Sequence, residues 1–148
     1  MDDTAADVEA IKQLKARYFR LMDTKDWDAM AQVFAPDVEI DMTGEDGTVH
    51  HGVDDFMPYL RANIELVITV HHGHMPEITL LSETTARGIW AMEDKLWWPE
   101  GSPLVHLHGY GHYHETYEKT GGQWRIKTLT LTRLHRQLVT AKDAGSAG

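Results

Sequence analysis

The stretch VEAIKQLKARYFRLMDTKDWD, residues 8–28, joins two helical patterns at one aspartate. Before that junction, apolar side chains recur at steps of three and four residues, which is the period of one face of a helix. The pattern breaks at Asp23. Asp26 is then placed to cap a second helix, which Pro36 ends. We therefore expect two helices that meet at a tight elbow at Asp23. The apolar positions of the first helix are Val8, Ile11, Leu14, Tyr18, Leu21 and Met22.

The rest of the chain is predicted to form one further helix and a series of strands. Helices followed by a run of strands favour the α+β class. We expect a cone-shaped barrel in which a curved antiparallel sheet packs against about three N-terminal helices and leaves one end open as a pocket. Residues 1–139 are predicted to form this single domain, and 140–148 a flexible tail. The expected strands cover 38–42, 76–81, 86–98, 104–118 and 124–134, and the expected third helix covers 53–66.

Composition excludes several classes of function. The 148 residues suffice for one domain, and a net charge of −9 argues against nucleic-acid partners and anionic membranes. There is no cysteine, so disulfides and thiolate chemistry are excluded. The acidic N-terminus has no signal-like apolar segment, and no apolar run reaches membrane length, so a cytoplasmic location without membrane partners is expected. No glycine-rich nucleotide loop or esterase serine motif follows a predicted strand.

Asp23 and His71 are the first candidates for chemistry. Asp23 is either a helix-boundary cap or a partly buried carboxylate that fixes the tautomer of a histidine. The sequence His71-His72-Gly73-His74 is either a polar start to a strand or the source of a general base. Strand alternation sends His71 and His72 to opposite faces, so only one of them can line a given pocket.

Asp94 is a third candidate, because it shares a predicted strand face with Trp90 and Met92. An unpaired carboxylate on an apolar face is costly. Asp94 is therefore expected either to be paired inside a pocket or to lie at its rim.

Four histidines of the next strand are spaced by two, four and two residues and project to one face. They suggest either a metal site or a polar outer sheet face that packs against another subunit, and the second interpretation is favoured, with no metal and no cofactor. On the opposite face, Gly109, Gly111 and Tyr113 would leave room for a ligand. The four histidines are His106, His108, His112 and His114.

Four strings, in order, carry a family resemblance: MDTKDWD (22–28), FAPDVEI (34–40), GIWAMED (88–94) and GQWRI (122–126). Over residues 6–136 the chain resembles the SnoaL-like branch of the nuclear transport factor 2-like superfamily. This resemblance implies a cone-shaped α+β barrel with a deep apolar pocket. Within the branch, the chain is most similar to cofactor-free dehydratases of the scytalone dehydratase and bile acid 7α-dehydratase types.

The resemblance also implies roles for single residues. His71 would be the base, Asp23 would orient it, Tyr18 would hydrogen-bond the substrate oxygen, and Asp94 would protonate the departing hydroxyl. For that last role, Asp94 would have to hold a proton. Where scytalone dehydratase has two tyrosines on the substrate carbonyl, this chain has methionines, which implies a more apolar pocket. The implied substrate contacts are Met22, Trp27, Met42, Trp90, Met92, Tyr113 and Arg133, with Arg133 matched only after a one-residue gap.

The expected function is a cofactor-independent lyase. It would be a dehydratase that removes water from a carbonyl-activated, steroid-like or polyketide-like molecule by acid–base catalysis. An isomerase or a polyketide cyclase could use the same pocket, and a non-catalytic protein could bind an apolar ligand there. A metal enzyme would instead use the four histidines of the strand at 104–118. A homodimer or homotrimer is expected from the polar sheet face.

Overall fold

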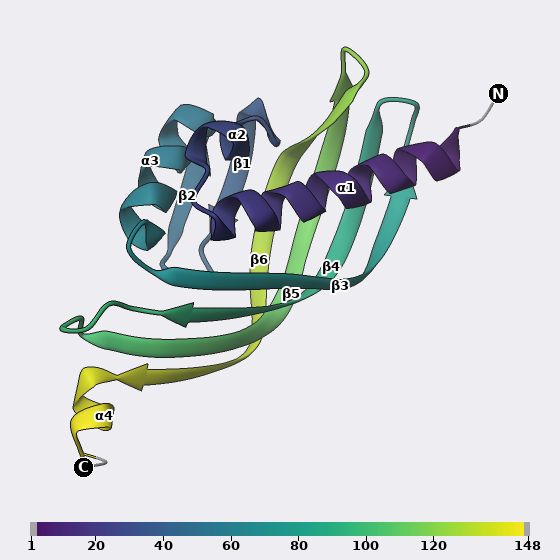
Figure 1. Cartoon of the computed structure of the whole chain (residues 1–148). Helices are drawn as coiled ribbons and strands as arrows, with labels where there is room; N and C mark the ends of the chain where they lie inside the picture. Colours follow the sequence, from purple (N-terminus) through teal and green to yellow (C-terminus); the bar gives the residue numbers. More distant parts are fainter. Residues whose placement is uncertain (1–2, 147–148) are drawn as a thin grey trace.

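The apolar pattern at the N-terminus forms helix α1 (Thr4–Asp23), which lies across the concave face of a curved sheet (Figure 1). The structure is a computed structural model and describes residues 3–146. The predicted elbow follows α1 directly: Lys25 takes a left-handed φ of 62°, and Asp26 caps the next helix by accepting from the Ala29 amide. The later elements are α2 (Trp27–Ala31), β1 (Phe34–Met42), β2 (Thr48–His51), α3 (Val53–Ile64), β3 (Ile68–Leu80), β4 (Thr85–Trp97), β5 (Leu104–Thr120), β6 (Gln123–Thr140) and α4 (Ala141–Ser146).

The six strands form one sheet in the order β2-β1-β6-β5-β4-β3. Its two edges are β2 and β3, so the sheet curves without closing on itself. The predicted α+β class, a cone of curved sheet covered by N-terminal helices, is confirmed. The expectation of a wholly antiparallel sheet is corrected at one pair, because β1 and β6 run parallel. Most of the chain separates these two strands, so no hairpin forces them to be antiparallel.

Two strands start earlier than the sequence pattern suggests. The second helix, expected to run to Phe34, ends at Ala31, and β1 begins at Phe34 and contains Pro36. The pairing of β1 with β6 is irregular between Phe34 and Glu39, where proline cannot donate a ladder hydrogen bond. Strand β3 begins at Ile68, eight residues before the predicted start, because an edge strand tolerates polar residues and prolines.

The C-terminal segment also differs from its prediction. Strand β6 continues to Thr140, and residues Ala141–Ser146 form helix α4 where a flexible tail was expected. Thr140 accepts a hydrogen bond from the Asp143 amide through its hydroxyl, and it donates to the Asp143 carboxylate. Such a reciprocal cap is known to stabilise the start of a helix. Residues 147 and 148 lie outside the described part of the chain, and the flexibility of the tail stays a prediction.

No helix within residues 3–146 is long and apolar enough to cross a membrane. The predicted cytoplasmic location and the predicted homodimer or homotrimer stay predictions.

A buried ion pair joins α1 to the middle of the sheet. Lys15 Nζ donates to Glu115 Oε2 at 2.7 Å, and neither side chain is accessible to solvent. The Tyr117 hydroxyl donates to the other oxygen of Glu115 at 2.7 Å, and Trp90 Nε1 donates to the Tyr117 hydroxyl at 2.9 Å. Burial lowers the pKa of Lys15 to about 8, although the attraction of Glu115 opposes this shift. The network therefore places one compensated charge pair inside an otherwise apolar core.

We predict that Lys15→Met lowers the free energy of unfolding by about 3–5 kcal/mol, because Glu115 is left buried without its cation. The double variant Lys15→Met/Glu115→Gln removes both charges and keeps an acceptor for Tyr117, so it should lose much less. Urea-induced unfolding followed by circular dichroism measures both effects. A double variant that is less stable than the single variant would contradict this account of the ion pair.

Candidate active site

A cavity of about 310 Å³ opens at the end of α1, between α3, the sheet and the turn that joins β1 to β2. Seven of the eleven residues predicted for the site line it. These are Tyr18, Met22, Met42, His71, Asp94, Tyr113 and Arg133. Apolar side chains from α3, β4, β5 and β6 make up most of the remaining wall, so the cavity is an apolar space with a few polar groups, as ligand sites commonly are.

Asp23 and His71 form a hydrogen-bonded pair at this cavity. His71 Nδ1 lies 2.7 Å from Asp23 Oδ1, and the backbone amide of His71 donates to Asp23 Oδ2 at 2.8 Å. Because an ionised carboxylate can only accept, Nδ1 carries the proton and Nε2 is left as the unprotonated nitrogen. Asp23 thus fixes both the orientation and the tautomer of a side chain that lines the cavity, an arrangement typical of a general base.

Thr69 and Phe19 contact the pair and hold it in place. The Thr69 hydroxyl donates to Asp23 Oδ1 at 2.9 Å and accepts from Lys25 Nζ at 2.8 Å. The Phe19 ring stacks on the His71 imidazole, with centroids 6.4 Å apart and planes 16° apart. A Cβ atom at Gly73 would lie 2.7 Å from the Phe19 ring, so glycine is required there for Phe19 to reach the imidazole. The helix elbow and β3 therefore both support the dyad.

Asp94 is paired with Arg133. Arg133 Nη1 donates to Asp94 Oδ1 at 2.7 Å and Nη2 donates to Oδ2 at 2.9 Å. Two parallel hydrogen bonds of this kind are the arrangement of an ionised carboxylate with a guanidinium. The paired alternative predicted for Asp94 is therefore the one observed. The proton-holding Asp94 that the resemblance implied is not what this geometry favours, because both carboxylate oxygens already accept.

An irregularity in β6 turns Arg133 toward the cavity. Tyr110 pairs with His135 but the next residue, Gly111, pairs with Arg133, so β6 carries one extra residue at this point. A Cβ atom at Gly109 would lie 2.3 Å from Arg133 Nη1 and 2.5 Å from Asp94 Oδ1. The space expected for a ligand beside this glycine is therefore filled by the ion pair, which corrects that prediction.

Tyr18 and Tyr113 form the floor of the cavity. Their rings meet edge to face at 5.7 Å. Lys15 Nζ lies 3.7 Å from the centroid of each ring. Burial raises the pKa of both phenols well above the ordinary value, so both remain neutral hydroxyls near pH 7. They can serve as hydrogen-bond donors to a ligand oxygen but not as bases.

Sequence reasoning missed the polar groups on the opposite wall. Glu45 and Asp46 belong to the turn between β1 and β2, and Tyr59 belongs to α3. The Tyr59 hydroxyl makes a short hydrogen bond to Asp46 Oδ2, and burial, with Asp46 adding to the effect, raises the pKa of Tyr59 to about 12. The local sequence indicates only a surface turn, since its closeness to β6 depends on the parallel pairing of β1 with β6.

Three predicted substrate contacts lie elsewhere. Trp27 lines a separate hollow between α2 and α3, because the short helix α2 turns that face away from the sheet. Trp90 and Met92 are buried on the inner face of β4, where Trp90 bonds to Tyr117 and Met92 Sδ lies 3.9 Å from Arg133 Nη1. They support the residues that line the cavity.

The histidines of β5 lie on the other face of the sheet. His108 Nε2 lies 3.0 Å from Glu93 Oε2, and His106 Nδ1 lies 2.8 Å from the carbonyl oxygen of Leu96. The predicted separation of His71 from His72 is confirmed, since the His72 side chain is 56% exposed and also faces Glu93, at 3.9 Å. Within residues 3–146, no group of three or more histidine, aspartate or glutamate side chains is arranged to hold a metal ion.

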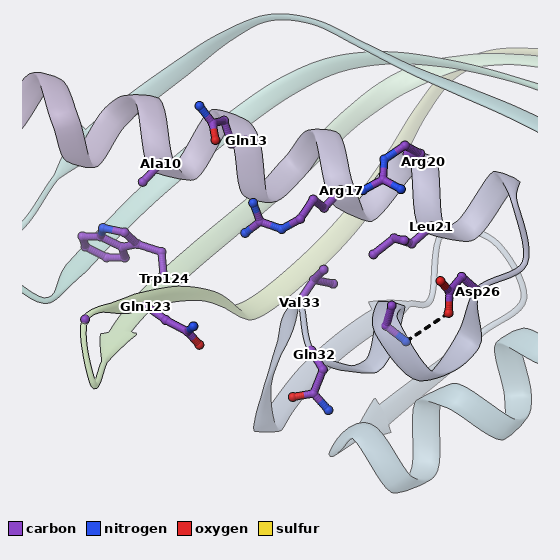
Figure 2. A pocket seen from close by; sticks show the side chains of 12 residues that line it. Ala10, Gln13, Arg17, Arg20, Leu21, Asp26, Gln32, Val33, Gln123 and Trp124 are labelled. Atoms are coloured by element: carbon purple, nitrogen blue, oxygen red, sulfur yellow. Dashed lines mark hydrogen bonds between the residues drawn. The ribbon is translucent and has the colours of Figure 1, made fainter.

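A larger hollow, of about 710 Å³, lies between α1, α2 and the turn joining β5 to β6 (Figure 2). Its polar lining includes Arg17, Arg20 and Asp26. Asp26 caps α2 by accepting from the Ala29 amide, the dashed line in Figure 2. Arginine stays protonated in proteins and this carboxylate is committed to a cap, so the hollow lacks a group suited to removing a proton from carbon.

We predict that neutral His71 carries its proton on Nδ1, because Asp23 accepts from that nitrogen. Long-range ¹⁵N–¹H correlation spectra of histidine-labelled protein distinguish the two tautomers. Asp23→Asn should weaken the preference, since a neutral amide accepts less strongly than a carboxylate. Observation of the Nε2–H tautomer in the unmodified protein would contradict the assigned roles of the two ring nitrogens.

We also predict that Gly109→Ala destabilises the protein by about 1–3 kcal/mol, because the added methyl group forces Arg133 and Asp94 apart. Gly145→Ala is the control, since a Cβ atom there meets open space. Thermal unfolding compares the two variants. Equal stability of Gly109→Ala and the unmodified protein would show that the ion pair can shift without cost.

Comparisons with known proteins agree with this architecture. The protein named Probable cyclase FGR4, from Gibberella zeae, is 27% identical over 139 residues, which cover 88% of this chain and 93% of that protein. A protein assigned as a scytalone dehydratase from Novosphingobium aromaticivorans superposes with a TM-score of 0.82 at 22% identity, covering 93% of this chain and 90% of that one. A hexachlorocyclohexane dehydrochlorinase from Novosphingobium barchaimii gives a TM-score of 0.78 at 18% identity, covering 94% of each chain.

Because they are only 22% and 18% identical in sequence, the two solved structures establish the fold alone. The family is established separately, by sequence. The model of the SnoaL-like domain matches residues 3–130, which is most of the chain, and the predicted resemblance is thereby confirmed. This protein belongs to the SnoaL-like domain family.

Proposed function

We propose that this protein is a cofactor-independent lyase, most simply a dehydratase that acts on a carbonyl-activated small molecule. The observation that carries the proposal is the Asp23–His71 pair. Asp23 binds Nδ1 of an imidazole that lines an apolar cavity, so Nε2 remains as the base. A base held in this way can remove a proton from a carbon atom next to a carbonyl group.

The proposed reaction begins when His71 Nε2 takes that proton, and the electron pair of the broken C–H bond forms an enolate. Asp23 stabilises the resulting imidazolium, as a carboxylate next to a histidine does in other acid–base sites. Tyr18 or Tyr113 donates a hydrogen bond to the enolate oxygen. The enolate then expels the hydroxyl group from the neighbouring carbon, and the proton held by His71 leaves with it as water.

Asp94 has a different role here from the one that the resemblance implied. Its two oxygens accept from Arg133, so His71 is the better placed source of the proton for the departing hydroxyl. We assign Asp94 to holding Arg133 against the cavity wall. A well-placed general acid or base contributes about 10²- to 10⁴-fold to rate, so most of the expected acceleration depends on His71 and its orientation.

The cavity suits a compact apolar substrate. Its volume of about 310 Å³ is at the lower end of the range for small-molecule sites, and methionine and leucine side chains line much of it. Flexible methionines such as Met22 and Met42 adapt to flat ring systems. The apolar lining supports a steroid-like or aromatic polyketide-like substrate, and the volume favours the smaller members of this class.

Ring closure is the second candidate, and one observation favours it. The relative from Gibberella zeae is named a cyclase, and the similarity covers 93% of it. Elimination and a cyclisation or isomerisation that proceeds through an enolate can share the first proton removal and differ in what the enolate does next. A protein that only binds an apolar ligand would need the cavity but not the Asp23–His71 pair.

The test is a panel of polycyclic β-hydroxy ketones incubated with the protein in D₂O and followed by mass spectrometry. A dehydratase releases product that has lost one water, whereas an isomerase or cyclase gives product of unchanged composition apart from deuterium. His71→Ala should lower kcat/KM by about 10²- to 10⁴-fold. His72→Ala is the matched control, because His72 lies on the opposite face of the same strand. Full turnover by His71→Ala would exclude His71 as the base.

A further inference from the structure

Arg133 is the one cation among the residues that line the cavity, and its donors are fully used. Nη1 donates to Asp94 and points its other hydrogen toward Met92 Sδ, at 3.9 Å. Nη2 donates to Asp94 and, at 3.4 Å, to Glu45 Oε2, and Nε donates to Glu45 Oε1 at 2.5 Å. A guanidinium has five N–H donors, so none is left for a ligand while Glu45 stays in place.

The charges around the cavity also disfavour an anionic ligand. Three carboxylates line it, those of Glu45, Asp46 and Asp94, against the single guanidinium. Behind this lining, Asp23 adds a fourth carboxylate, and Lys25 and Arg136 add two cations beside Asp23 and Glu45, so the sum of these charges stays negative. An anionic ligand would therefore meet an excess of like charge inside a partly enclosed space, where repulsion is stronger than in water.

Glu45 is fixed in its position by contacts on both sides. Its carboxylate also lies 3.6 Å from Arg136 Nη1, and its side chain is only 16% exposed. Its backbone amide donates to the carbonyl oxygen of Met42 at 2.9 Å, and the next residue, Asp46, accepts from Tyr59 of α3. A carboxylate ligand would have to displace this anchored side chain to reach Arg133.

We propose that Glu45 is a specificity-determining residue: by occupying Arg133, it makes the cavity accept uncharged carbonyl or hydroxyl compounds and reject carboxylates. The inference deepens the proposed function, on which it rests for the location of the site. It concerns binding alone, so it holds or fails independently of turnover. The excess of negative charge and the occupied donors of Arg133 act here against the wrong ligand, as repulsive elements do in other specific sites.

Two probes of the same ring system test the proposal, the uncharged 2-acetylnaphthalene and the anionic 2-naphthoate, with binding measured by calorimetry at pH 7.5. The unmodified protein should bind the ketone at least about tenfold more tightly than the carboxylate. Glu45→Gln frees donors of Arg133 and removes one negative charge, so it should reduce that preference by about tenfold or more, mainly through tighter binding of 2-naphthoate. Glu39→Gln, the same change at an exposed carboxylate of β1, should leave the preference unchanged.

Equal or tighter binding of 2-naphthoate by the unmodified protein would overturn the proposal, as would binding of neither probe. An unchanged preference in folded Glu45→Gln would also overturn it. If that variant does not fold, Arg133→Gln provides the second test, and it should leave 2-naphthoate the weaker ligand. Neither probe carries a leaving hydroxyl group, so the preference is measured without turnover, and loss of the proposed selectivity can be told apart from loss of the proposed chemistry.

Discussion

The buried ion pair between Lys15 and Glu115 fixes helix α1 on the concave face of the sheet, and the candidate site depends on that placement. Both charges are removed from water, so a shift of the helix along the sheet would leave each of them buried and unpaired. The same ammonium lies against the rings of Tyr18 and Tyr113, which form the floor of the cavity. One interaction therefore sets both the register of α1 and the position of two site residues.

Asp23 lies two turns further along the same helix, where α1 ends. Its carboxylate accepts from the Thr69 hydroxyl and from the backbone and side chain of His71, so it joins the helix end to the edge strand β3. A second charged cluster, Glu45 with Arg133 and Asp94, joins the β1–β2 turn to the centre of the sheet across the cavity. The cavity thus lies between two charged clusters, and most of its remaining lining is apolar, which suits acid–base chemistry on an uncharged substrate.

The differences between the predicted and observed elements have local physical causes. The polar residues 71–74 were predicted to start a strand. They lie within β3, which begins at Ile68, because β3 is an edge strand and leaves alternate side chains in solvent. Pro36 was predicted to end the second helix, but that helix already ends at Ala31, and Pro36 lies within β1, where the pairing with β6 is irregular. The strand β2 has four residues, too few for an alternating pattern to stand out from the turn before it.

The sequence by itself determined the order of the first three helices and of strands β1 and β3 to β6, the elbow at Asp23, and the faces on which His71 and Asp94 lie, but not β2 or α4. These follow from periods of 3.6 and 2 residues and from capping residues, all of which are local properties of the chain. Tertiary structure alone decided that Arg133 pairs with Asp94, since this depends on one extra residue in β6 and on the absence of a side chain at Gly109. It also decided that Glu45 lines the cavity and binds Arg133, because a contact across 88 residues of sequence forms only when β1 packs beside β6.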